Sequence, residues 1–261
     1  MNSRSDNQSI DPSVRTNSAG DGSVLIVAGE VSGDIHAGNM LGELRRLRPA
    51  LRTFGVGGDR LRSAGLDVIA STDELAHMGL IEVLREIPKI RRLMNRIVNE
   101  ARQRKPALAV LVDSPDFNLR LAKRLQGLGV PVVLYVSPQL WAWRRGRVRT
   151  VRRLAREVLC LLPFEVPFYD AHQVPARYVG HPLVDEIARV GLLDKPGGGL
   201  SGRLALLPGS RGMEVAQLLP VMLEALAHVP SELVNDVVLV EAPGVEPLIT
   251  SILGRAVTDP R

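Results

Sequence analysis

Asp113, Asp116 and Asn118 follow a short apolar segment near the middle of the chain. That segment, Leu108–Val112, is typical of a strand buried on both faces, as in a parallel sheet. Pro115 cannot continue the hydrogen-bond ladder of a strand, so the strand must end before it. Ligands of open α/β sheets bind beyond the carboxyl ends of the strands. Asp113 is therefore expected where ligands bind and chemistry takes place.

A second apolar segment, Val132–Val136, leads into a loop, Ser137–Trp143, that holds both tryptophans of the chain. Seven arginines and no acidic residue follow: Arg144, Arg145, Arg147, Arg149, Arg152, Arg153 and Arg156. This arginine tract predicts binding to phosphate or lipid headgroups, and a solvated basic face is the alternative. Nucleic acid is disfavoured, because few aromatic residues are present for base stacking.

Two loops have the composition of phosphate- or sugar-binding turns. Gly29–Asp34 lies between an expected strand, Ser23–Ala28, and an amphipathic helix that Pro49 stops. Glycines there allow a phosphate or sugar to approach the helix N-terminus. Pro208–Arg211 offers backbone N–H groups, a hydroxyl and a guanidinium to a diphosphate. For both loops, a tight turn without a ligand is the alternative.

The segments that surround these loops alternate between strand and helix. A short strand, Leu51–Phe54, and a plain glycine-rich turn, Gly55–Asp59, are expected first. From Met78 to Ile97 apolar residues recur at helical spacing, and Pro88 predicts a kink or break. Its apolar residues are expected to face the core, and its basic residues have two interpretations. They form a solvated face, which we favour, or a face that meets anionic lipid.

The alternation continues to the end of the first domain. A helix is expected from Asn118 to Gln126, and a strand at Glu157–Leu162 precedes a short helix. Tyr178–Pro182 then closes the domain. Its His181 is either a structural histidine or a ligand-binding one.

After the glycine-rich linker Gly197–Gly199, the pattern restarts. Leu204–Leu207 is expected to be a strand, Met213–His228 a helix and Asn235–Val240 a second strand.

The composition agrees with a globular α/β protein. The chain has 261 residues, 45% of them hydrophobic and 23% charged, with a net charge of +5 that suggests an anionic partner. The lone Cys160 requires no oxidising compartment. No apolar run approaches the ~18 residues of a membrane span. Residues 1–22 lack the apolar core of a signal peptide, so we expect a disordered tail on a cytoplasmic protein.

The ordered set of motifs resembles lipid-A-disaccharide synthase, a glycosyltransferase of the GT-B kind (family 19). The resemblance rests on these segments: Ala28–Asp34, Met78–Leu84, Asp113–Asn118, Tyr135–Arg144, Leu162–Glu165, Val179–Pro182 and Leu206–Arg211 with Glu214. They run from Val24 to about Pro230 in the order of the family.

The resemblance implies transfer of 2,3-diacylglucosamine from its UDP-activated form onto 2,3-diacylglucosamine 1-phosphate, with inversion and without metal or other cofactor. Such a transfer needs a base for the acceptor hydroxyl and positive groups for the leaving diphosphate. Asp113 resembles the proposed base of the family, and Arg211 its diphosphate-side arginine. Asp116 and Asn118 are expected to orient the loop, Asn118 as a cap of the following helix.

The resemblance also implies two sets of binding residues. For the acylated sugars we expect Glu30, Ser32, Gly33, Asp34, Asn118, Ser137, Gln139, Trp143 and His181. For the nucleotide sugar we expect Gly209, Ser210, Arg211 and Glu214.

The implied fold is two Rossmann-type parallel-sheet domains facing a cleft, the second incomplete. We expect the tail at 1–22, an acceptor domain at 23–195 and a partial nucleotide-sugar domain at 196–261. The absence of the later nucleotide-binding segment of the family predicts a truncated chain, so an inactive fragment that still binds lipid or phosphate is one alternative. A different GT-B enzyme, such as a UDP-sugar epimerase, is another.

As partners we expect the two acylated sugars and an anionic membrane surface, at the inner face of the inner membrane. A homodimer is expected only for a full-length form.

Overall fold

The computed structural model describes residues 22–72, 74, 83–191, 202–242 and 244–258. The chain forms two compact units, which divide between Val190 and Gly191. Residues 1–21 of the predicted tail and the glycine-rich linker lie outside the described residues. Each unit is described by itself below.

The first unit contains a parallel sheet which, in the described part of the chain, has seven strands in the order β3-β2-β1-β4-β5-β6-β7. The strands are β1 (Val24–Ala28), β2 (Thr53–Gly57), β3 (Asp67–Ser71), β4 (Leu108–Val112), β5 (Val132–Tyr135), β6 (Glu157–Cys160) and β7 (Ala176–Tyr178). The connecting helices are α1 (Val31–Leu47), α2 (Asp59–Ser63), α4 (Val83–Arg104), α5 (Pro115–Gln126), a 3₁₀ turn η1 (Arg145–Arg147), α6 (Val148–Leu154), α7 (Glu165–Asp170) and α8 (Pro182–Arg189). This is the doubly wound order of a Rossmann-type fold.

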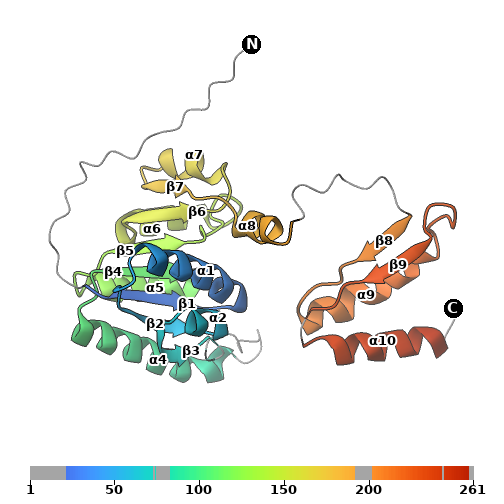
Figure 1. Cartoon of the computed structure of the whole chain (residues 1–261), viewed down its shortest axis with the longest axis horizontal. Helices are drawn as coiled ribbons and strands as arrows, with labels where there is room; N and C mark the ends of the chain where they lie inside the picture. Colours follow the sequence, from blue (N-terminus) through green and yellow to red (C-terminus); the bar gives the residue numbers. More distant parts are fainter. Residues whose placement is uncertain (1–21, 73, 75–82, 192–201, 243, 259–261) are drawn as a thin grey trace, which may run out of the picture. The chain divides into compact units, whose positions relative to one another are not determined.

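Alternate residues of the central strands face two separate cores, as the two-residue period of a strand requires. Leu25 and Leu111 belong to a core that α4, α5 and α6 cover. Ile26 and Val110 belong to the opposite core, which α1 and α2 cover (Figure 1). The apolar runs predicted as strands buried on both faces are therefore confirmed at β1, β4 and β5.

The segment around β2 differs from the prediction. The predicted turn at Gly55–Asp59 is wrong for its first half, because β2 runs from Thr53 to Gly57 and is fully buried. Gly55 has a φ of 153°, and an added Cβ would lie 1.7 Å from the carbonyl oxygen of Ile26 in β1. The glycines were interpreted as turn formers, whereas this one allows two strands to pack closely.

Two helices also differ at their ends. The segment 78–82 of the predicted long helix lies outside the described residues, and from Val83 the helix continues through Pro88 without a break. Leu93, Met94 and Ile97 are buried against the sheet, so the core-facing prediction is confirmed. The helix α5 begins at Pro115, three residues earlier than predicted, so Asn118 lies inside the helix and does not cap it.

The second unit contains a parallel pair, β8 (Arg203–Leu206) and β9 (Asp236–Leu239), with α9 (Gly212–Leu226) between them in sequence. A helix that the sequence did not reveal, α10 (Glu246–Thr258), follows. It packs on α9 around a small core of Val215, Leu219, Val245 and Ile249.

Replacement of Gly55 by alanine should lower the free energy of unfolding by about 3 kcal/mol, because the new methyl group enters the backbone of β1. Urea unfolding of the whole chain measures this change. The same substitution at Gly42, where an added Cβ meets no atom of the described chain within 4 Å, should instead raise stability by up to about 1 kcal/mol. Equal effects at the two positions would contradict the steric explanation.

Candidate functional site

The pairing of β1 with β4 brings two loops together at the carboxyl edge of the sheet. The register places Ala28 opposite Val112, so the chain leaves both strands at the same level. The strand order reverses between these two strands, and such a switch point is where open α/β sheets bind ligands. The predicted position of Asp113 at the end of a central strand is confirmed.

The Asp113 side chain is held by the loop and by α1. Its Oδ1 accepts the N–H of Ser114 at 2.9 Å, and its Oδ2 accepts the hydroxyl of Ser32 at 3.3 Å. Both Asp113 and Ser114 have left-handed backbones, with φ of 54° and 41°. Consecutive left-handed residues other than glycine are uncommon and tend to occur at functional sites.

Asn118 anchors this strained turn from inside the first turn of α5. It is buried, and its Nδ2 donates to the carbonyl oxygens of Val112 and Asp113, at 3.1 and 2.6 Å. The predicted capping role is wrong because these acceptors belong to the end of β4 rather than to the helix. The amide instead ties the strand end to the helix that follows it.

Glu30 and Gly33 complete the wall next to Asp113. The hydroxyl of Ser114 donates to Glu30 Oε1 at 3.5 Å, which links the two loops a second time. Gly33 is buried, and a Cβ added there would lie 3.5 Å from the Cβ of Asp113. That is an ordinary van der Waals distance, so α1 lies close to Asp113 at Gly33, but a larger residue than glycine would also fit at this position.

Asp34 is placed differently from the other predicted residues of this loop. Its carboxylate is buried and accepts the backbone N–H groups of Gly58, Arg60 and Leu61, at 2.7, 3.0 and 3.2 Å. These groups begin α2, whose first N–H groups have no partners within the helix. The geometry therefore favours a structural role for Asp34 rather than contact with a substrate.

Two histidines lie beside this site, and only one of them was predicted. His36 follows Ser32 by one helical turn, so both lie on the same face of α1. Its ring stands edge-on to that of His181, with 6.2 Å between centroids. His181 caps α8, because its Nδ1 accepts the N–H of Leu183 at 3.2 Å. The i, i+4 spacing from Ser32 was the available signal for His36.

Burial lowers the pKa of His36 below its ordinary value, and the charge of His181 lowers it further, while the carboxylate of Asp113 opposes both. Its Nδ1 is buried and has no hydrogen-bond partner among the described residues. Burial and the charge of His181 thus favour the neutral form of the His36 imidazole.

A cavity of about 720 Å³ opens beside the two histidines, between α1 and α8. Gly180 and Pro182, the neighbours of His181, line it together with Gly38 and Tyr135. Its volume lies within the range of small-molecule sites.

The loop after β5 contains the next predicted residues. Ser137 is buried, and its hydroxyl bonds to Tyr169 Oη at 3.1 Å, so this group is used inside the protein. Gln139 is exposed, and Trp143 retains 67% of its surface. The second tryptophan, Trp141, donates its Nε1–H to the buried Glu165 at 3.3 Å.

Asp116 connects this loop to the Asp113 turn. Its carboxylate pairs with Arg144, at 3.0 Å, and with Arg147. Burial would raise the pKa of Asp116, but the hydrogen bonds and charges of the two arginines outweigh it and hold the pKa below its ordinary value. The arginine tract is thus partly paired, while Arg149, Arg152, Arg153 and Arg156 are exposed.

In the second unit, the four predicted nucleotide-sugar residues meet at one turn. Gly209 has a φ of 115°, and an added Cβ would lie 2.7 Å from Glu214 Oε2. Glu214, in the first turn of α9, accepts the N–H of Ser210 at 3.3 Å and pairs with Arg211 at 3.0 Å. The hydrogen bond from Arg211 is the main cause that lowers the pKa of Glu214. The turn therefore leads into the N-terminus of α9, where backbone N–H groups favour an anion.

No group of three or more His, Cys, Asp or Glu side chains among the described residues is arranged to hold a metal ion. No helix within the described ranges has the length and apolar character needed to cross a bilayer.

The fold and site define the class of protein: an α/β chain of the GT-B kind, with a Rossmann-type domain and a second, smaller parallel sheet. A solved UDP-GlcNAc 2-epimerase from Neisseria meningitidis, bound to UDP-GlcNAc, shares this fold. The TM-score is 0.55 at 10% identity, over 85% of this chain and 67% of that one.

The sequence comparisons then specify the family. Residues 24–254 match the family model described as lipid-A-disaccharide synthetase, so the chain belongs to that family. A lipid-A-disaccharide synthase from Myxococcus xanthus (strain DK1622) is 49% identical over 220 residues, 80% of this chain and 56% of the relative. One from Solibacter usitatus (strain Ellin6076) is 44% identical over 83% of this chain and 58% of the relative. The chain thus spans somewhat more than half the length of these relatives.

The lowered pKa of His36 predicts a loss of stability in mild acid. The unfolded chain binds a proton at the ordinary pKa of 6.5, whereas the folded chain binds it only at lower pH. His36 therefore makes its full contribution to the free energy of unfolding above about pH 6.5, and this contribution is lost as the pH falls below that value. Between pH 7.5 and pH 5, the free energy of unfolding measured with urea should fall less for His36→Gln than for the wild type.

His172→Gln, the same change at an exposed histidine, is the control. If the free energy of unfolding changes with pH to the same extent in both variants, His36 is not the source of the pH dependence.

Proposed function

We propose that this chain carries the acceptor-side machinery of an inverting glycosyltransferase. The reaction joins UDP-2,3-diacylglucosamine to 2,3-diacylglucosamine 1-phosphate and gives a β-1,6-linked disaccharide 1-phosphate and UDP. The observation that carries the proposal is the preorganised Asp113 turn at the switch point of the sheet. The membership of the chain in the lipid-A-disaccharide synthase family supports the choice of substrates.

In this proposal Asp113 acts as the general base that removes the proton from the acceptor hydroxyl. A carboxylate is an effective base when it is fixed within hydrogen-bond reach of that hydroxyl. Ser32 fixes one of its oxygens and the N–H of Ser114 the other, and each oxygen keeps a further acceptor position. Asn118 holds the backbone of the turn, so we assign it a positioning role. The lowered pKa of His36 favours its neutral form, which places no positive charge near Asp113 that would make the carboxylate less basic.

The turn before α9 is proposed to bind the diphosphate of the nucleotide sugar. It combines the backbone N–H of Gly209 and the hydroxyl of Ser210 with the guanidinium of Arg211 at the N-terminus of a helix of 15 residues. Charge develops on the diphosphate as the glycosidic bond to UDP breaks, and such groups stabilise that charge. Glu214 orients Arg211 through their ion pair.

The acylated substrates suggest that the protein works at the inner face of the inner membrane as a peripheral protein. The exposed Trp143 directly precedes the arginine tract in the sequence, and tryptophan together with basic residues is a combination typical of membrane interfaces. The basic face of α4 is a second exposed cationic surface, but it has no tryptophan. We propose the arginine tract as the main contact because it also carries the tryptophan.

A UDP-sugar epimerase is the alternative for which a structural neighbour exists, but the likeness at 10% identity concerns the fold alone. A chain that binds lipid without transferring sugar is the other. Release of UDP that depends on both acylated sugars distinguishes a transferase from either alternative.

Asp113→Asn should lower turnover by roughly 10²–10⁴-fold, since a general base contributes about that much. Asparagine also tolerates the left-handed backbone, so the turn should remain intact. UDP release should be measured for the 261-residue chain and for a chimera completed with the C-terminal remainder of the Myxococcus xanthus relative.

The matched control is Asp59→Asn, which removes a carboxylate that is 96% exposed on α2 and should leave turnover unchanged. Near-normal turnover of Asp113→Asn in a form that is otherwise active would exclude this residue as the base. UDP release without the acceptor sugar would refute the transferase itself.

Replacement of Arg149, Arg152, Arg153 and Arg156 by glutamine should weaken binding to anionic vesicles by about ten-fold or more, because each basic residue near the surface contributes to attraction. It should also reduce the salt dependence of binding. Arg144 and Arg147 are retained, so the ion pairs with Asp116 are kept. Vesicle co-sedimentation at two salt concentrations measures both effects.

The control for this variant removes the same charge from four exposed arginines elsewhere in the first unit: Arg46, Arg48, Arg60 and Arg62. It should bind vesicles nearly as well as the wild type. Equal weakening by the two variants would mean that net charge alone, rather than the tract, drives binding.

A further inference from the structure

A second polar cavity lies at the opposite edge of the sheet from Asp113. Its volume is about 540 Å³, and its walls come from the amino ends of β1, β2 and β3 and from the C-terminal ends of α1 and α4. Each central strand has five residues at about 3.3 Å per residue, so roughly 15 Å of sheet separates this cavity from the Asp113 turn. A ligand here would not occupy the proposed transferase site.

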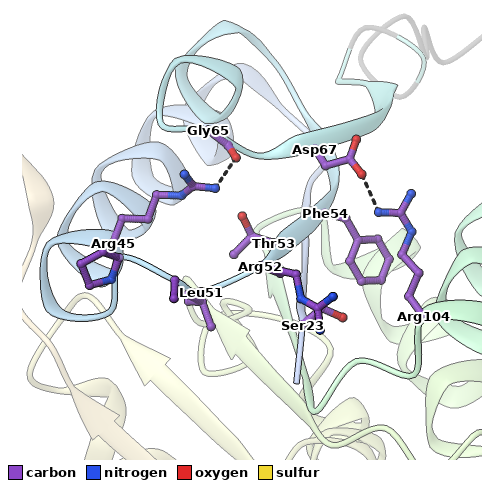
Figure 2. A pocket seen from close by; sticks show the side chains of 11 residues that line it. Ser23, Arg45, Leu51, Arg52, Thr53, Phe54, Gly65, Asp67 and Arg104 are labelled. Carbon is purple, nitrogen blue, oxygen red and sulfur yellow. Dashed lines mark hydrogen bonds and ion pairs between the residues drawn. The ribbon is translucent and has the colours of Figure 1, made fainter. Parts of the chain in front are cut away.

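Three guanidinium groups border this amino-edge pocket. Arg45 and Arg104 reach in from opposite sides, with Thr53, Phe54 and Arg52 between them (Figure 2). Arg45 donates through Nη2 to the carbonyl oxygen of Gly65.

Arg104 pairs with Asp67 and Glu100 and lies over the ring of Phe54, 4.7 Å from its centroid. The three arginines carry three positive charges, against the two negative charges of Asp67 and Glu100. The lining therefore carries a net positive charge.

The same pocket contains buried polar atoms that are not satisfied by the described residues. Ser23 Oγ, Thr53 Oγ1 and Arg45 Nε are all buried, and none has a hydrogen-bond partner within the part of the chain that the structure describes. Thr53 is 5% exposed, at the first position of β2. A single buried hydroxyl of this kind is costly, and buried polar groups nearly always find a partner. The residues that carry these three atoms come from three separate segments and line one cavity, which points to a shared ligand.

We propose that the amino-edge pocket binds a phosphate group, carried by a small molecule or by a lipid headgroup. Arg45, Thr53 and Ser23 line the cavity and supply a guanidinium and two hydroxyl groups as donors, within a lining of net positive charge. A phosphate has enough oxygens to accept from all of them, and guanidinium groups match its geometry. The cavity has the volume of a small-molecule site, which leaves room for the group that bears the phosphate.

The proposal is independent of the transferase assignment, and its test uses no activity measurement. Thermal unfolding and titration calorimetry of the 261-residue chain should be followed with sodium phosphate, and with sodium chloride at matched ionic strength. A ligand that binds only the folded state raises the melting temperature by mass action. Phosphate should therefore stabilise the wild type beyond the effect of chloride.

Two variants remove donors of the pocket. Arg45→Gln removes a charge, and Thr53→Val keeps the side-chain shape but removes the hydroxyl. Each should weaken phosphate binding about ten-fold or more. Without phosphate, Thr53→Val should melt at the wild-type temperature or above it, because an unsatisfied buried hydroxyl is lost. Arg46→Gln, the same charge change at the exposed neighbour of Arg45, should bind phosphate as the wild type does.

A second arm identifies the source of the phosphate. Vesicles of phosphatidylcholine with phosphatidic acid are compared with vesicles of phosphatidylcholine alone. If the wild type binds the vesicles with phosphatidic acid, and both Arg45→Gln and Thr53→Val weaken this binding, the ligand is a lipid headgroup. If the two variants lose only the response to free phosphate, and vesicle binding is unchanged, the ligand is a soluble molecule. If both variants respond to phosphate and to the vesicles as the wild type does, the proposal is overturned.

Discussion

The pairing of β1 with β4 is the constraint on which the first unit depends. It joins the two halves of the sheet, and its register sets the level at which the loops of Glu30 and Asp113 leave the strands. Because the chain winds outward in both directions from this pair, the helices that follow the two strands cover opposite faces. The N-termini of α1 and α5 are thereby brought to the same place. A shift of one residue in the register would reverse the facing of every side chain in one strand.

The strained turn at the end of β4 is maintained by contacts from three elements. Asn118 bonds to its backbone from α5, Ser32 to its carboxylate from α1, and Asp116 ties the start of α5 to the arginines before α6. Left-handed residues cost free energy and persist only where the surroundings over-determine them. The same contacts that offset this cost also fix the carboxylate in one orientation, and orientation is the main requirement for a base.

The sequence was sufficient to predict the central strands, the position of Asp113 and the turn at Arg211, because each depends on a local pattern. It was insufficient where a residue acts on a distant segment. Asp34 accepts backbone groups 24 to 27 positions away, and Gly55 is required by the neighbouring strand. Asn118 has the residue type of a helix cap, and only the early start of α5 at Pro115 shows that it bonds backward to β4. Pairing and register had to be known before these roles could be assigned.

The two edges of the sheet are also electrostatically different, and this difference decides how the arginines at the amino edge should be interpreted. Arg45 and Arg104 lie in the last turns of α1 and α4, where basic residues are common because they offset the partial negative charge of a helix C-terminus. That charge is about half an elementary charge, so a whole guanidinium exceeds it. The helix ends alone would account for basic residues on the surface. They do not account for the buried hydroxyl of Thr53, which a helix end neither requires nor satisfies, and this group is what distinguishes a binding pocket from ordinary helix termination.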